Sequence, residues 1–131
     1  MPYRARIVSF DKESQAAQSI LGLEASEESA RIMAPKTLFR VIALKGVRNA
    51  VATILKQEML AAGADAAVSK YTVDCSRPTT DVLLFGTLAQ YRRMLLKMRG
   101  QGYGIKRKPE YEDKFREYYE LADEIESVLK S

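Results

Sequence analysis

The chain has 131 residues, 47% of them hydrophobic and 29% charged, and a formal net charge of +4, which fits one domain with a core of its own. Histidine is absent, which excludes Ser-His-Asp and Cys-His nucleophiles and histidine zinc sites, and the single cysteine, Cys75, excludes an internal disulfide. No apolar run reaches the roughly 18 residues of a membrane helix, so we expect no membrane contact. The lone cysteine fits a reducing cytoplasm, and we expect a cytoplasmic protein without metal or cofactor.

The first part of the chain predicts one strand and two helices. Polar and apolar residues alternate over Tyr3–Phe10, which is typical of a half-buried strand. Asp11 is expected to cap a helix that runs to Leu23. A second, short helix is expected to begin at Ser26 and to stop near Pro35, because the residue before a proline avoids the helical region.

The middle of the chain predicts a strand, a helix and two further strands. Leu38–Lys45 is rich in β-branched and large apolar residues, as strands are. Val47–Ala62 carries an apolar stripe at helical spacing, and Gly63 is placed to end that helix in a left-handed cap. Asp65–Lys70 and Asp81–Phe85 are the next expected strands, the second of them central in the sheet.

A capping box then opens another helix. Thr87 and Gln90 have the spacing of that motif, and the helix is expected over Leu88–Arg99, before a last strand at Tyr103–Lys106. The order of these elements is that of the split β-α-β unit of ferredoxin-like folds. We therefore expect an α+β sandwich extended by the N-terminal strand and helix; the alternative is a small open α/β sheet.

The C-terminal residues 109–131 predict a long amphipathic helix that follows a domain of residues 1–108. Six apolar residues repeat with a strict 4-3-4-3-4 spacing: Tyr111, Phe115, Tyr118, Ala122, Ile125 and Leu129. Such a stripe packs a terminal helix on its own domain, or forms a seam with a second copy or a partner domain. A homo-oligomer through Tyr111–Leu129 is thus one expectation.

Basic residues gather just before this helix, without an acidic residue among them. They are Arg92, Arg93, Lys97, Arg99, Lys106, Arg107 and Lys108. This stretch is a candidate nucleic-acid surface. We rank that interpretation behind a solvated helix face that the acidic C-terminal helix partly neutralises, because no nucleic-acid-binding motif accompanies the charge.

Several blocks of sequence resemble one known family in the same order. They are MAPK (Met33–Lys36), ILKQEMLAAGADAAV (Ile54–Val68), TTDVLLFGT (Thr79–Thr87), LAQYRRMLLKMR (Leu88–Arg99) and the pair Tyr103-Gly104. Together they are similar to the N-terminal extension that precedes the catalytic barrel of some bacterial and archaeal dihydropteroate synthases. Where that family usually has a second glycine, this chain has Ala64. The catalytic (β/α)8 barrel needs about 250 residues, so the likeness is to the accessory domain alone.

The resemblance implies a non-catalytic accessory or interaction domain of folate biosynthesis. It would dock a dihydropteroate synthase-type barrel domain, a second copy or an anionic pterin-type ligand. The candidate ligand-binding residues are Lys56, Gln57, Asp65, Lys70, Asp81 and Thr87. The two lysines and the helix N-terminus at Thr87 would hold a pyrophosphate. The alternative is an enzyme that uses aspartate and lysine groups, but no acid–base pair converges, so we expect no catalysis by the isolated chain.

Overall fold

The structure, a computed structural model, describes residues 2–72, 74, 76–101 and 109–130, with the backbone alone at 101 and 109–115. Its elements are α1 (Glu13–Leu21), α2 (Glu27–Met33), the 3₁₀ helix η1 (Ala34–Lys36), β1 (Phe39–Arg48), α3 (Asn49–Ala61), β2 (Asp65–Ala67), the 3₁₀ helix η2 (Lys70–Thr72), β3 (Thr79–Thr87), α4 (Leu88–Gln101) and α5 (Pro109–Leu129). The chain divides into two compact units, Met1–Phe39 and Arg40–Ser131. None of the described helices is long and apolar enough to cross a membrane.

The first unit contains both expected helices. The Ser26 hydroxyl accepts a hydrogen bond from the Ser29 N–H at 3.1 Å, so the predicted N-cap of α2 is confirmed. The cap predicted at Asp11 is wrong, since α1 begins only at Glu13. The Gln15 side chain accepts hydrogen bonds from the N–H groups of Asp11 and Lys12 instead, at 3.1 and 3.2 Å.

The N-terminal strand expected at Tyr3–Phe10 is wrong. Residues 4–10 have no regular secondary structure, and the Ile7 side chain is almost fully exposed. The sheet of the described residues contains β1, β3 and β2 and none of these residues. Alternation gives a segment one apolar face, but a strand also needs a neighbouring strand to take its backbone hydrogen bonds.

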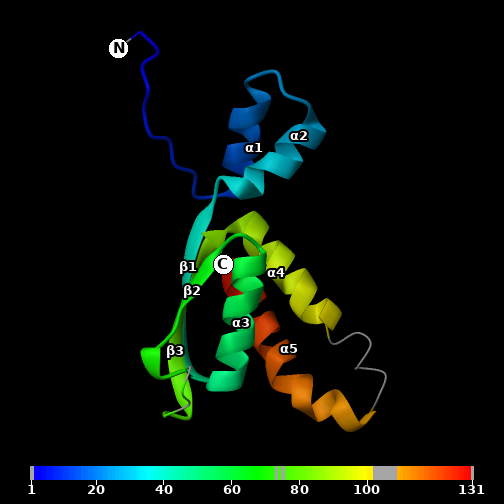
Figure 1. Cartoon of the computed structure of the whole chain (residues 1–131). Coiled ribbons are helices and arrows are strands. Elements are labelled where there is room, and N and C mark those ends of the chain that lie inside the picture. Colours follow the sequence, from blue (N-terminus) through cyan, green and yellow to red (C-terminus); the bar gives the residue numbers. More distant parts are fainter. Residues whose placement is uncertain (1, 73, 75, 102–108, 131) are drawn as a thin grey trace. The chain divides into compact units, whose positions relative to one another are not determined.

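The second unit is built on a three-stranded antiparallel sheet with the strand order β1-β3-β2, so the α+β fold class is confirmed. β3 lies between the two strands that α3 connects, which is the split β-α-β arrangement. Asp65 is opposite Phe85 and Ala67 is opposite Leu83 in the register of β2 and β3. Helices α3, α4 and α5 lie together on one side of the sheet (Figure 1). The strand expected at Tyr103–Lys106 lies outside the described residues.

β1 contains a bulge that sets which of its side chains face the helices. Ile42 and Leu44 are buried, as alternation requires, but the next buried residue is Val47, three positions on. Gly46 has a φ of +64°, a conformation that glycine adopts readily. One extra residue in the strand therefore keeps Val47 on the helix side.

β2 is shorter than the predicted strand, which extended to Lys70. The backbone N–H of Ser69 donates to the Thr80 hydroxyl at 3.0 Å, and the chain then enters η2. Pairing with β3 therefore ends at Ala67, where the backbone hydrogen bonds of β2 stop following the ladder.

Two predicted helix ends in this unit are confirmed. Gly63 has a φ of +86° just beyond α3. Thr87 and Gln90 form the capping box: the Thr87 N–H donates to Gln90 Oε1 at 2.9 Å, and the Gln90 N–H donates to Thr87 Oγ1 at 3.2 Å. Gln90 Nε2 also donates to the Gly63 carbonyl at 3.0 Å, so one side chain ties the end of α3 to the start of α4.

The core of the second unit includes all three of its helices. Its fully buried large side chains are Leu55, Met59, Leu84, Tyr91, Met94, Met98 and Ile125. From α5, Tyr118, Ala122 and Ile125 belong to the same core cluster, with Leu129 packed at its edge. The described part of the apolar stripe of α5 thus faces its own unit; Tyr111 and Phe115 lie outside the described side chains.

Candidate functional site

Lys56 and Asp65 are the two predicted ligand-binding residues that the structure brings into direct contact. Lys56 Nζ donates to Asp65 Oδ1 at 3.2 Å and to the Ala66 carbonyl at 2.6 Å. The Ala66 N–H donates to Asp65 Oδ1 at 2.7 Å, and this bond, followed by that from Lys56, lowers the pKa of Asp65. The lysine is therefore engaged in holding β2 beside α3.

The other four predicted residues do not converge on this pair. Thr87 lies toward the same end of the sheet, because β3 passes Asp65 at Phe85 just before it. Its side chain and N–H are used in the cap of α4. Gln57 is exposed on α3.

Asp81 and Lys70 belong to the opposite end of the sheet. Asp81 precedes Thr87 by six residues of β3, which is roughly 20 Å of extended chain. Its carboxylate accepts a hydrogen bond from the Gly46 N–H at 3.0 Å. The Lys70 ammonium lies 5.1 Å from the centre of the Tyr71 ring, which Arg77 approaches to 4.2 Å.

The basic stretch lies partly on the exposed side of α4 and partly against α5. Arg92, Arg93 and Lys97 are exposed on α4, and the residues 106–108 lie outside the described part of the chain. Arg99 donates to Asp123 of α5 at 2.9 Å and also bonds Glu126. These bonds raise the pKa of Arg99 and lower that of Glu126. The acidic helix thus neutralises one member of the basic stretch.

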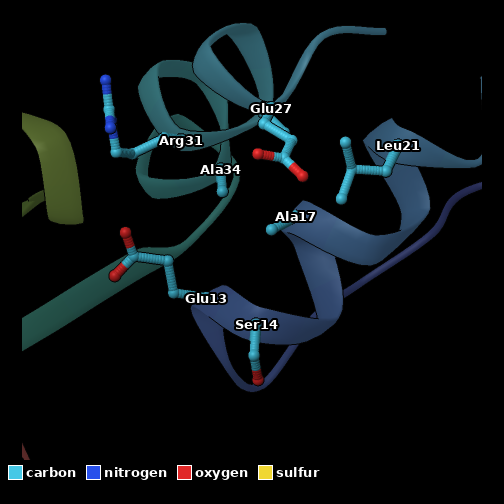
Figure 2. A pocket seen from close by; sticks show the side chains of 8 residues that line it. Glu13, Ser14, Ala17, Leu21, Glu27, Arg31 and Ala34 are labelled. Carbon is cyan, nitrogen blue, oxygen red and sulfur yellow. The ribbon is translucent and has the colours of Figure 1, made fainter. Parts of the chain in front are cut away.

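The first unit has an open cleft of about 440 Å³ between α1 and α2 (Figure 2). Its walls include the small or apolar side chains of Ala17, Leu21 and Ala34, with charged residues around them. The side chains of Arg31 and Glu13 extend from different helices and do not meet over the cleft (Figure 2). A small-molecule site needs polar groups that converge on one ligand, and this cleft lacks them.

Two buried polar residues, Glu58 of α3 and Tyr118 of α5, lie near each other in the core of the second unit. Glu58 is buried, although its residue type predicts a solvated side chain. Burial, followed by the charge of Glu58, raises the pKa of Tyr118, whose hydroxyl has no hydrogen-bond partner among the described residues. The sequence carries a signal for this pair: Glu58 is three residues after Leu55 and four before Ala62, on the buried stripe of α3.

The sheet face opposite the helices is open and apolar. Val41 of β1 is 59% exposed and Leu83 of β3 is 46% exposed. Ala43 and Ala67 are exposed on the same face, and Phe85 is half-buried there. An antiparallel sheet with one solvated face normally has polar residues on that face. In the sequence, the apolar runs at Val41–Leu44 and Val82–Phe85 indicate that both faces of these strands are apolar. Such runs also fit a strand that is buried on both faces, so they do not by themselves predict an exposed face.

Among the described residues, no group of three or more His, Cys, Asp or Glu side chains could hold a metal ion. Comparison of the chain with protein-family models, with curated proteins and with solved structures finds no match. The resemblance to the N-terminal domain of dihydropteroate synthases therefore stays a prediction from the sequence blocks. Within the described part of the chain, the open sheet face is a surface on which exposed apolar side chains of neighbouring strands lie together.

Proposed function

We propose that this chain is a non-catalytic docking domain that binds a folded partner domain through the open face of its sheet. The exposure of Val41 and Leu83, side by side with exposed alanines, supports this proposal. Contiguous apolar patches of this kind mark interaction surfaces because burying them is favourable by roughly 25 cal/mol per Å². The charged residues of this face, such as Lys45 and Asp81, lie toward the strand ends, as in the polar rim of an interface.

The partner in this proposal is a barrel domain of the dihydropteroate synthase type, on the same chain or on another one. The blocks Ile54–Val68 and Thr79–Thr87 supply this part of the proposal, through their resemblance to the accessory domain of those enzymes. The chain would then serve folate biosynthesis as a structural component and not as the transferase itself.

Binding of an anionic pterin-type ligand has less support. Lys56 directs hydrogen bonds at Asp65 and Ala66, and Lys70 belongs to the other end of the sheet from Thr87. Calorimetry with pterin pyrophosphate, with and without the barrel domain, tests this alternative directly. The nucleic-acid alternative rests on the basic stretch Arg92–Lys108, and a gel shift at low salt tests it.

Isothermal titration calorimetry with a purified dihydropteroate synthase barrel domain tests the docking proposal. Leu83→Lys places a charge in the centre of the open face and should weaken binding at least about tenfold, as expected for an interface core. The matched control is Leu60→Lys on α3, since Leu60 is 50% exposed but lies on a helix. Circular dichroism checks that both variants fold. Equal affinities for the two variants, or no binding of the unchanged chain, would overturn the proposal.

A further inference from the structure

The outer face of α4 presents an apolar side chain between basic ones. Leu96 is 78% exposed, more than any other large apolar side chain described in the second unit. Arg93 and Lys97 are exposed beside it, one helical turn apart. This arrangement is complementary to a surface that is apolar in the middle, where it would contact the leucine, and acidic at its edges, where it would pair with the basic side chains.

A groove with that character lies between β1 and α5. It has a volume of about 180 Å³ and is lined by Lys45, Gly46, Val47, Glu120, Leu121 and Glu124, with Glu117 at its side. Val47 is buried and Leu121 is half-buried, while Glu120 and Glu124 are exposed. Glu117 is engaged with Arg48 at 2.7 Å, so the free charges of the groove are those of Glu120, Glu124 and Lys45, and the two carboxylates leave it negative.

We propose that these two surfaces bind each other in different copies of the chain, with α4 of one copy docked in the α5 groove of the next. The spacing of the charges fits this pairing. Arg93 and Lys97 are four residues apart, as are Glu120 and Glu124, so two ion pairs form together while Leu96 enters the groove. Inside one chain, Arg99 of α4 already pairs with Asp123 of α5, which is a contact of the same basic–acidic kind.

The geometry of such an assembly follows from its using two different surfaces. Each copy offers one α4 face and one α5 groove, so the contact builds either a reciprocal two-fold dimer, a larger ring or an open chain. Exposed ion pairs contribute little individually and are screened by salt, so the assembly is weak and salt-sensitive. The contact uses β1 only at Lys45, Gly46 and Val47, so it leaves Val41 and Leu83 of the open sheet face available. The assembly and the docking function can therefore be tested separately.

Sedimentation velocity with two neutralised variants of the full chain tests the proposal. The first, R93Q/L96Q/K97Q, loses the α4 face and keeps the groove; the second, E120Q/E124Q, loses the groove and keeps the α4 face. Each variant alone should stay monomeric at concentrations where the unchanged chain assembles. Their equimolar mixture should form a 1:1 heterodimer and nothing larger, because only one productive contact exists in it.

Two controls separate this contact from the others. Raising the salt from about 50 mM to about 500 mM should weaken the assembly of the unchanged chain at least about tenfold. Leu83→Lys should assemble like the unchanged chain, because it alters only the open sheet face. An unchanged chain that is monomeric at every concentration would overturn the proposal. So would assembly of either neutralised variant alone, or assembly that only Leu83→Lys abolishes.

Discussion

The backbone N–H of Gly46 donates a hydrogen bond to Oδ1 of Asp81 at 3.0 Å, from the bulge of β1 to the first half of β3. The carboxylate thus satisfies an N–H group that the bulge displaces from the ladder between the strands. Asp81, a candidate ligand-binding residue by sequence, has a structural partner here. The pair also fixes the position at which Val47 returns to the core.

Replacing Gly46 by alanine should destabilise the protein by about 1–2 kcal/mol. The φ of +64° strains any side chain, although an added Cβ would meet no atom within 4 Å. The control is Gly100→Ala in α4, where the Cβ also has free space but no positive φ is present. That variant should gain up to about 1 kcal/mol from helix propensity. Urea unfolding of both variants measures the contrast, and a loss of equal size in both would contradict it.

A second glycine, Gly86, is required for space. A Cβ at Gly86 would lie 2.7 Å from the Cβ of Ala64 and 3.0 Å from Gln90 Oε1. Gly86→Ala should therefore cost about 1–3 kcal/mol in the free energy of unfolding. Adding Ala64→Gly should restore part of this loss, because it removes the nearer atom. A double-mutant cycle makes the comparison. If the losses of unfolding free energy in Gly86→Ala and Ala64→Gly simply add up in the double variant, the contact between the two Cβ atoms does not cause the loss in Gly86→Ala.

The two buried tyrosines should respond differently to loss of the hydroxyl. Tyr91 donates to the Arg40 carbonyl at 2.8 Å, and burial raises its pKa to about 12. Tyr91→Phe leaves that carbonyl without its donor and should cost about 1 kcal/mol. Tyr118→Phe removes a hydroxyl that has no partner among the described residues and should be neutral or stabilising by about 1 kcal/mol. Thermal unfolding compares them, and a clear loss for Tyr118→Phe would show that its hydroxyl is bonded.

The acid limb of the stability curve should depend on Asp65. Its pKa is lowered in the folded protein from the usual value of 3.8, so its stabilisation is present above that value and is lost as the pH falls through the folded pKa. Asp65→Asn should therefore flatten the decline in unfolding free energy below about pH 4. Lys56→Met should remove only part of the decline, because the Ala66 N–H is the larger cause of the shift. An unchanged acid limb in Asp65→Asn would refute this assignment.

Features fixed by neighbouring residues could be read from the sequence. The N-cap at Ser26, the capping box at Thr87 and the glycine end of α3 each depend on a few adjacent side chains, and all three are confirmed. The order of strands and helices from residue 38 onward also follows from local periodicity, and it led to the correct fold class.

Features that depend on distant partners could not be read in this way. Residues 3–10 have the pattern of a strand, yet no strand of the described sheet takes their hydrogen bonds. Asp81 acquires its role from Gly46, 35 positions away. Lys56 and Asp65 were predicted to share a site, and they are in contact. Both side chains also hydrogen-bond the backbone of Ala66, so the pair has a structural role in holding β2 beside α3. In each case the deciding partner comes from strand pairing or chain reversal, which one sequence does not specify.

The contribution of α5 to the core has a consequence for synthesis on the ribosome. Core residues run from Ile42 to Ile125, so the core cannot close until the last of these has emerged. At ~5–20 residues per second, translation between them takes on the order of ten seconds. During that interval the apolar sides of α3 and α4, with Leu55, Met59 and Met94, lack their final cover. A nascent chain of this protein therefore exposes apolar helix surfaces until α5 has been synthesised.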